Sequence, residues 1–339
     1  MSLQDQTADG RQSSGLLPWH RKPWDLLLAR RRSGTLPHAL LLRGRAGLGK
    51  NRFAQLLAQS LLCEQAAADG MPCGTCRGCR LFRAGSHPDM LTIAPAEAGK
   101  AILIDQIREL CAFVALKSQR TGYQIAVISP AERMNISAVN SLLKTLEEPS
   151  EQTLLILVSA RPSLLPATIR SRCQQVRFDE PPPEMALAWL APQTGEQDPQ
   201  LLLSLAGGAP LHALELLETG AVQGRMNRFD DLLQVARGEA DPVAVAGAWA
   251  AHGARECLSW VGTWVIDMIR LKSAGAAAVV ANRDLRERLQ WLGERLDLKT
   301  LYGHLDRVLE ASRLVDGQLN QQLLLEDLLT TWAGLARAR

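Results

Sequence analysis

The sequence has no long hydrophobic run and no excess of one charge. No stretch approaches the about 18 uninterrupted apolar residues of a membrane-spanning helix, so no membrane contact is expected. Residues 1–15 are polar and lack the hydrophobic core of a signal peptide; we expect them to be a flexible tail of a cytoplasmic protein. The formal net charge of +3 gives no global basic field that would mark a nucleic-acid binder. With 47% apolar residues among 339, the composition predicts a folded protein of two or three domains.

A glycine-rich segment resembles a phosphate-binding loop but lacks its hydroxyl. Residues 44–51 read Gly-Arg-Ala-Gly-Leu-Gly-Lys-Asn, which fits G-x-x-x-x-G-K but has Asn where Ser or Thr should follow. The glycines allow backbone N–H groups to face a phosphate, and the lysine brings an ammonium to it. The carboxamide of Asn51 replaces the hydroxyl that ligates Mg²⁺. The candidate nucleotide ligands are Gly44, Gly47, Gly49, Lys50 and Asn51.

The residues on either side of this loop predict the context that a phosphate loop needs. His38 to Arg43 is a short apolar run suited to a buried strand, and residues 53–62 have apolar side chains at helical spacing. An ordinary glycine turn before a helix is the alternative, which three glycines and a lysine disfavour. We therefore predict a degenerate site where ATP or ADP is possible but is not hydrolysed.

The second half of a nucleotide site is also incomplete. Residues 124–128 form an apolar run that predicts a buried strand, after which a phosphate-loop ATPase normally has Asp and Glu. Here Ser129 and Pro130 follow, so neither Mg²⁺ binding nor activation of a water molecule is expected from them. Glu132 lies beyond the proline and could take part only through an irregular turn.

Four cysteines have the spacing of a metal site. They are Cys63, Cys73, Cys76 and Cys79, in the pattern C-x₉-C-x₂-C-x₂-C. Four thiolates suit a tetrahedral Zn²⁺, and Gly74 and Gly78 supply the tight backbone between them. Because no position is left for water, we predict a structural zinc module over residues 63–79. An iron–sulfur cluster is the alternative use of four cysteines.

Three arginines, Arg77, Arg80 and Arg83, surround the cysteine pattern. They could contact phosphate, but a solvated basic face is the simpler interpretation and the one we favour.

The order of elements predicts an α/β part followed by an all-α part. Residues 154–158 are a further apolar strand, and strands that alternate with helices indicate a mostly parallel sheet covered on both faces. A proline-rich linker at residues 179–183 marks the end of the α/β domain. We expect an α/β domain at 16–179, a small helical lid at 180–220 and a second helical domain at 221–339. Six of the eight tryptophans lie after residue 180, and core packing explains most of them.

The motifs taken together resemble the clamp-loader family of AAA+ proteins, over the whole chain. The shared features are Pro18-Trp19, the four cysteines, Ser86-His-Pro-Asp89, Leu142-Leu-Lys-Thr-Leu-Glu-Glu-Pro149 and Ser171-Arg-Cys173. An ATP-hydrolysing member would have Thr at Asn51, Asp-Glu at Ser129-Pro130 and an arginine at Leu211. The resemblance is therefore to a non-hydrolysing member, with no enzyme activity of its own expected.

The resemblance implies a role in DNA replication within the DNA polymerase III holoenzyme. It implies that Arg172 is an arginine finger that acts in trans on the ATP of a neighbouring subunit. It also implies a helical collar at 221–339, gamma/tau and delta partner subunits, and an indirect action on the β sliding clamp and primer-template DNA.

Two other interpretations of the chain stay open at this point. One is a weak phosphate-loop ATPase that uses Lys50 on its own, and the other is a zinc-organised nucleic-acid-binding module. The histidines show no metal or triad spacing, and Lys144 receives no role.

Overall fold

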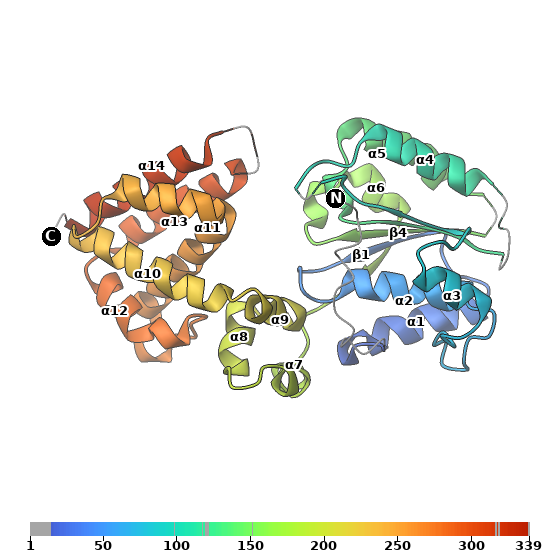
Figure 1. The fold of residues 1–339 in the computed structure, drawn as a ribbon, viewed down its shortest axis with the longest axis horizontal. Coiled ribbons are helices and arrows are strands. Elements are labelled where there is room, and N and C mark those ends of the chain that lie inside the picture. The colour runs from blue at the N-terminus through green and yellow to red at the C-terminus, as the bar shows by residue number, and fades with distance from the viewer. Residues whose placement is uncertain are drawn as a thin grey trace. The chain divides into compact units, whose positions relative to one another are not determined.

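The computed structural model describes residues 15–97, 99–116, 118, 122–150, 152–315, 317 and 319–337. The tail expected at residues 1–15 lies, except for Gly15, outside the described residues. The chain divides into two compact units, Met1–Pro181 and Pro182–Arg339 (Figure 1). The boundary in the chain falls within the proline-rich linker. The predicted further division at residue 220 stays a prediction.

The first unit is built on a parallel five-stranded sheet, as the alternation of strands and helices predicts. Its strands are β1 (Ala39–Arg43), β2 (Met90–Ile93), β3 (Gln124–Ile128), β4 (Thr153–Ser159) and β5 (Gln174–Arg177). Their order across the sheet is β2-β3-β4-β1-β5, and all the pairs are parallel. The segment after β1 therefore leaves the sheet between the ends of β4 and β5.

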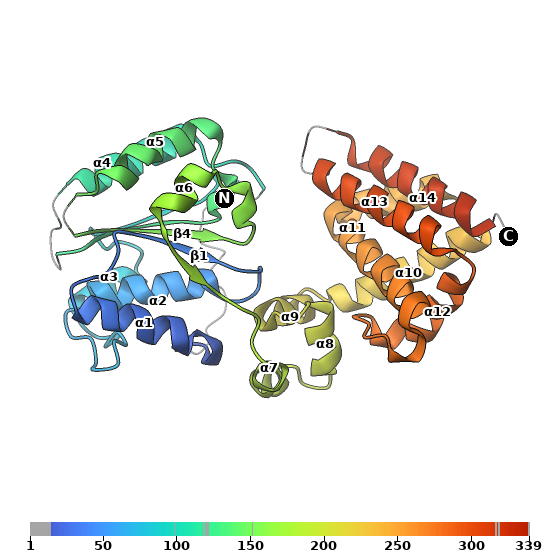
Figure 2. The same ribbon diagram turned by 180° about the vertical axis from the view of Figure 1, so that it is seen from behind.

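Helices cover both faces of this sheet. They are α1 (Arg21–Arg32), α2 (Lys50–Leu62), α3 (Arg77–Arg83), α4 (Ile104–Ala115), α5 (Ile136–Glu147) and α6 (Ala167–Arg172). Figures 1 and 2 show α1, α2 and α3 on one face and α4, α5 and α6 on the other. Ala39 and Leu41 of β1 belong to the core beneath α4 to α6. Leu40 and Leu42 are equally buried, which explains the continuous apolar run of this strand.

The second unit is helical in its described residues. It contains α7 (Pro183–Leu190), α8 (Pro199–Leu205), α9 (Pro210–Glu218), α10 (Ala221–Arg237), α11 (Pro242–Ala274), α12 (Arg286–Glu294), α13 (Leu298–Leu314) and α14 (Gln321–Arg337). One continuous apolar cluster runs through these helices. A wide apolar face of α11 is buried within this unit, with Trp264 fully covered. The all-α prediction for this part is confirmed.

Among the described residues, no single helix has both the length and the apolar character needed to cross a membrane. The pair α8 and α9 meets both criteria only when joined, across a bend of 105°.

Candidate functional site

The phosphate loop lies between β1 and α2, in the strand–loop–helix context that the sequence predicts. Gly47 and Gly49 have φ angles of 75° and 82°, in the left-handed region that favours glycine. Gly44 has a φ of 151°, and a Cβ atom there would lie 2.3 Å from the carbonyl oxygen of Phe178. Each glycine of the motif is thus needed for the path of the backbone itself.

Lys50 is the first residue of α2 and its side chain is only 5% exposed. Its Nζ donates a hydrogen bond to the carbonyl oxygen of Arg45, at 2.6 Å, within the same loop. Burial lowers the pKa of Lys50 to about 8, and the nearby charge of Glu132 partly opposes this shift. The ammonium that would meet a phosphate is therefore held by the backbone of its own loop.

The carbonyl of Leu48, at the centre of the loop, is fixed by two side chains that sequence reasoning missed. Trp19 donates from Nε1 at 3.0 Å and His20 from Nε2 at 2.7 Å. The His20 ring packs edge-on against Phe53 and Phe178. Burial lowers the pKa of His20 to about 4, although its bond to Leu48 opposes the shift. The only sequence signal was Pro18-Trp19, which entered as part of the family resemblance.

The remaining parts of a hydrolytic site are missing from this region. The Asn51 side chain is exposed on α2, and Ser129 and Pro130 follow β3 directly. Glu132 sits in a 3₁₀ turn, and its Oε1 accepts from the backbone N–H groups of Ala160 and Arg161, in the loop after β4, at 3.1 and 3.2 Å. This 3₁₀ turn is irregular backbone of the kind that Glu132 would need in order to take part in the site.

Two buried oxygens near this loop have no hydrogen-bond partner among the described residues. They are Oε2 of Glu132 and Oγ of Ser159, the last residue of β4. No sequence pattern points to Ser159, because a serine at the end of an apolar run looks like the start of a turn.

A cavity of ≈ 750 Å³ opens beside the first half of the loop. Its charged lining residues are Arg43, Arg45, Arg177, Asp179 and Glu180. Arg45 pairs with Glu180 at 3.0 Å, so a loop residue is tied to the segment that follows β5. The volume is within the usual range for a small-molecule site.

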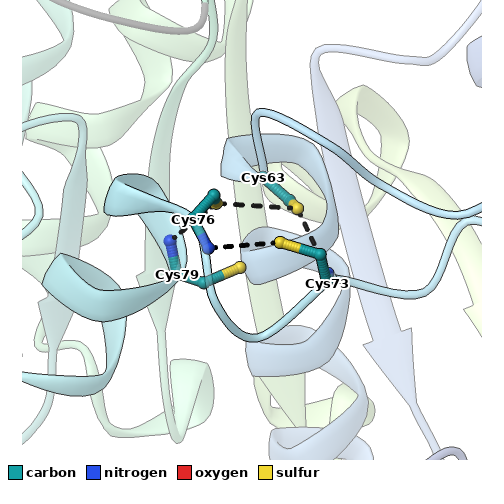
Figure 3. A group of neighbouring side chains, drawn as sticks. All are labelled: Cys63, Cys73, Cys76 and Cys79. Atoms are coloured by element: carbon teal, nitrogen blue, oxygen red, sulfur yellow. Dashed lines mark hydrogen bonds between the residues drawn. The ribbon is translucent and has the colours of Figure 1, made fainter.

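The four predicted cysteines come together in space. Cys63 follows the last residue of α2, Cys73 lies in the following loop, Cys76 directly precedes α3, and Cys79 lies in the first turn of α3 (Figure 3). Their sulfur atoms all lie within 4.8 Å of one another, with Cys63 and Cys76 sulfurs 3.9 Å apart. Gly78 is required here, because a Cβ atom would meet the carbonyl oxygen of Leu62 at 2.5 Å.

This arrangement fits the donor set of a tetrahedral metal site. Backbone N–H groups of Cys73, Cys76 and Cys79 each donate to the sulfur of the preceding cysteine of the pattern, at 3.3 Å. Such bonds lower the pKa of Cys73 to about 6, whereas burial raises that of Cys79 to about 12. Four sulfurs at these separations could surround one Zn²⁺ ion at a Zn–S distance of about 2.3 Å. The arginines beside the cluster, Arg77, Arg80 and Arg83, are exposed on α3.

Arg172 is the last residue of α6, and its side chain is 35% exposed. Its Nε donates to Oε1 of Glu147, the residue that ends α5, at 2.8 Å. Its Nη1 also donates to the carbonyl of Thr168 at 3.1 Å. The candidate finger is therefore paired with a carboxylate of the LLKTLEEP segment in this chain.

The motifs also include Leu211 and Lys144. Leu211 is in the first turn of α9, in the second unit, and Lys144 is exposed on α5.

A phosphate loop on a parallel sheet, a four-cysteine cluster and a following helical unit define a phosphate-loop-type protein with a separate α-helical part. The family described as "DNA polymerase III, delta subunit" matches residues 19–182, and "DNA polymerase III, delta subunit, C terminal" matches residues 219–334. The chain belongs to the DNA polymerase III delta′ subunit family, and the resemblance to clamp-loader proteins is thereby confirmed.

Individual relatives agree with this assignment. The chain is 35% identical to DNA polymerase III subunit delta′ of Pseudomonas aeruginosa, over 94% of this chain and 98% of the relative. It is 32% identical to the protein of the same name from Escherichia coli, over 92% and 93%. A gamma subunit-related protein of Thermotoga maritima shows a weaker structural likeness, with a TM-score of 0.47, 17% identity and coverage of 92% and 100%.

Proposed function

We propose that this chain is an AAA+-type clamp-loader subunit that does not hydrolyse ATP itself and that completes the ATP site of a neighbouring subunit with Arg172. In this function it acts with gamma/tau and delta subunits to open the β sliding clamp and place it on primed DNA. The observation that carries the proposal is the contrast between an incomplete site around Lys50 and an intact, exposed arginine at the end of α6.

The incomplete site supports the non-hydrolysing half of the proposal. Hydrolysis requires a hydroxyl or carboxylate for Mg²⁺ and a base that orients water. Asn51 has no hydroxyl at the position next to Lys50, Ser129-Pro130 offer no carboxylate and no base, and Oε1 of Glu132 already accepts from two backbone N–H groups. The Nζ atom of Lys50 is present, but it donates one of its hydrogen bonds to the carbonyl oxygen of Arg45. ATP or ADP can occupy such a loop without turnover.

The pairing of Arg172 supports the other half. An ion pair between partly exposed groups is worth about 0–1 kcal/mol, so Glu147 holds the arginine only weakly. A phosphate carries more charge than a carboxylate and accepts bidentate hydrogen bonds from a guanidinium. Arg172 can therefore exchange Glu147 for the γ-phosphate of a neighbouring subunit.

The cysteine cluster completes the proposal as a structural Zn²⁺ site. Cys63, Cys73, Cys76 and Cys79 would hold the ion with all positions filled by sulfur. The ion would tie the segment at 63–79 to the end of α2 and would take no part in chemistry. Within the second unit, residues 180–220 would act as the lid and residues 221–339 as the collar that joins the subunits.

The test is reconstitution of the clamp loader with the intact chain or with Arg172→Ala. We expect the variant to assemble normally. Hydrolysis at the neighbouring ATP site that Arg172 completes should slow by about 10³- to 10⁵-fold. The total clamp- and DNA-stimulated ATP turnover should therefore fall by the fraction that this site contributes. Arg108→Ala is the matched control, because Arg108 is an exposed arginine in an ion pair on α4. Unchanged turnover in a complex shown to contain the variant would refute the role of Arg172.

A further inference from the structure

Trp291 is the most exposed tryptophan among the described residues of the helical unit. Its side chain is 37% exposed on α12, whereas Trp249, Trp264 and Trp332 are almost completely buried. The guanidinium carbon of Arg295 lies 3.5 Å from the centre of the Trp291 ring, and that of Arg237 lies 5.5 Å from it. Both distances are within the range of cation–π attraction. Two cations from different helices thus gather at one exposed aromatic ring.

The charges of both arginines lack a carboxylate partner among the described residues. The side chain of Arg237 forms no hydrogen bond or ion pair with any residue that the structure describes, and that of Arg295 donates only to the carbonyl of Trp291, at 2.8 Å. Most of the ten guanidinium N–H groups, five on each side chain, are therefore available. Arg237 ends α10 and Arg295 follows the last residue of α12, and a cation at a helix C-terminus is held favourably. The two guanidinium groups are therefore held in place before any ligand binds, and no carboxylate among the described residues neutralises their charges.

This arrangement fits small separate anions better than a polyphosphate chain. A nucleic-acid backbone is bound by rows of cations, each of which neutralises one phosphate. At the Trp291 ring two guanidinium groups meet, and their two charges match two separate carboxylates. Carboxylate side chains can each take one guanidinium in a bidentate pair while their apolar stems cover the indole. Trp and Arg are also the residues that contribute most to binding energy at protein interfaces.

We propose that Trp291, Arg237 and Arg295 form a docking site for an acidic peptide segment of a partner protein. Two carboxylates of the segment pair with the two guanidinium groups, and the edge of the indole packs against the chain between them. The site lies outside the phosphate loop, the cysteine cluster and Arg172, and it does not depend on the function proposed for them.

The test is fluorescence anisotropy with the full chain and a short fluorescein-labelled peptide of alternating glutamate and serine. The same peptide with glutamine in place of glutamate should not bind, and added salt should weaken binding of the acidic form. Arg237→Gln and Arg295→Gln should each weaken binding by about tenfold, and the double variant should abolish it. Arg313→Gln, an exposed arginine on α13, is the matched control and should bind normally.

Variants of the aromatic ring separate docking from a merely structural role. Trp291→Phe keeps a ring for the two cations and should retain most of the binding, whereas Trp291→Ala should lose it; circular dichroism confirms folding of each variant. Equal affinity in the double arginine variant would overturn the proposal. So would binding of a single-stranded oligothymidylate of similar length in preference to the acidic peptide, which would make the partner a nucleic acid.

Discussion

Lys50 and His20 are buried basic side chains, and each donates a hydrogen bond to a backbone carbonyl of the phosphate loop. Lys50 donates to the carbonyl of Arg45, and His20 donates to that of Leu48. Burial disfavours the charged form of both side chains, which is why both pKa values are lowered. The loop shape is thus specified by protein groups, whether or not a nucleotide is bound.

His20 should make the first unit sensitive to mild acid. Its pKa is about 4 in the folded chain and about 6.5 when exposed, so the unfolded chain takes up the proton first as the pH falls. The stabilisation is complete above about pH 6.5 and is lost toward pH 4. We expect the free energy of unfolding to fall by about 2 kcal/mol from this group between pH 7 and pH 5. His20→Gln should remove that part of the pH dependence.

Hydrogen exchange of the β1 and β4 amides at the two pH values would measure this effect in the first unit. His304, whose pKa burial also lowers to about 4, lies in the helical unit and should report there instead. The exposed His252 is the control, since His252→Gln should keep the full pH dependence. An equal loss of stability in the intact chain and in His20→Gln would contradict the assignment.

Helix α2 connects the two sites of the first unit. Lys50 begins it at the phosphate loop, and Cys63 follows its end at the cysteine cluster. Its 13 residues span roughly 20 Å at 1.5 Å per residue. Because α3 approaches α2 closely at Gly78, order in the cluster stabilises the C-terminal end of the helix that carries the loop.

Removal of zinc should therefore loosen the module over residues 63–79. We expect about one Zn²⁺ per chain by elemental analysis, and a chelator should lower the melting temperature of the intact chain because metal binding is coupled to folding. Cys76→Ser should lose most of the metal. Cys111→Ser should keep it, since Cys111 lies outside the cluster and contacts Thr145. A metal-free chain of unchanged stability would show that the four cysteines have another role.

Strands that are buried on both faces could be predicted from sequence, and edge strands could not. β1, β3 and β4 occupy the centre of the sheet and consist of the apolar runs that the sequence displays. β5 reads Gln-Gln-Val-Arg, and only its valine is buried, so its pattern resembles a loop. β2 at the other edge is also only partly buried. Their positions depend on pairing with distant strands.

Contacts between sequence neighbours and contacts between distant segments pose different problems of prediction. In the cysteine cluster and the phosphate loop, neighbours in sequence remain neighbours in space, so a local pattern was sufficient. The contact of His20 with Leu48 depends instead on the packing of an N-terminal turn against the loop. The turn of Glu132 toward Ala160 depends on the pairing of β3 with β4. Neither contact has a local signature.

The purified chain alone should not hydrolyse ATP above background. The missing Mg²⁺ ligand and base should each cost orders of magnitude in rate. Lys50→Ala should therefore leave the background rate unchanged, while affinity for a fluorescent ADP analogue reports separately on occupancy. The intact clamp loader assayed in parallel serves as the positive control. Turnover by the isolated chain that disappears in Lys50→Ala would instead favour an independent ATPase.

The close approach of Gly44 to the Phe178 carbonyl has an evolutionary consequence. The glycine is kept by backbone packing against the end of β5, so selection preserves it even where no phosphate is bound. A lineage can therefore lose nucleotide chemistry one side chain at a time, as at Asn51, while the motif persists as a trace of ancestry. In such a lineage the glycines indicate only the origin of the fold, and the residues beside them indicate the present function.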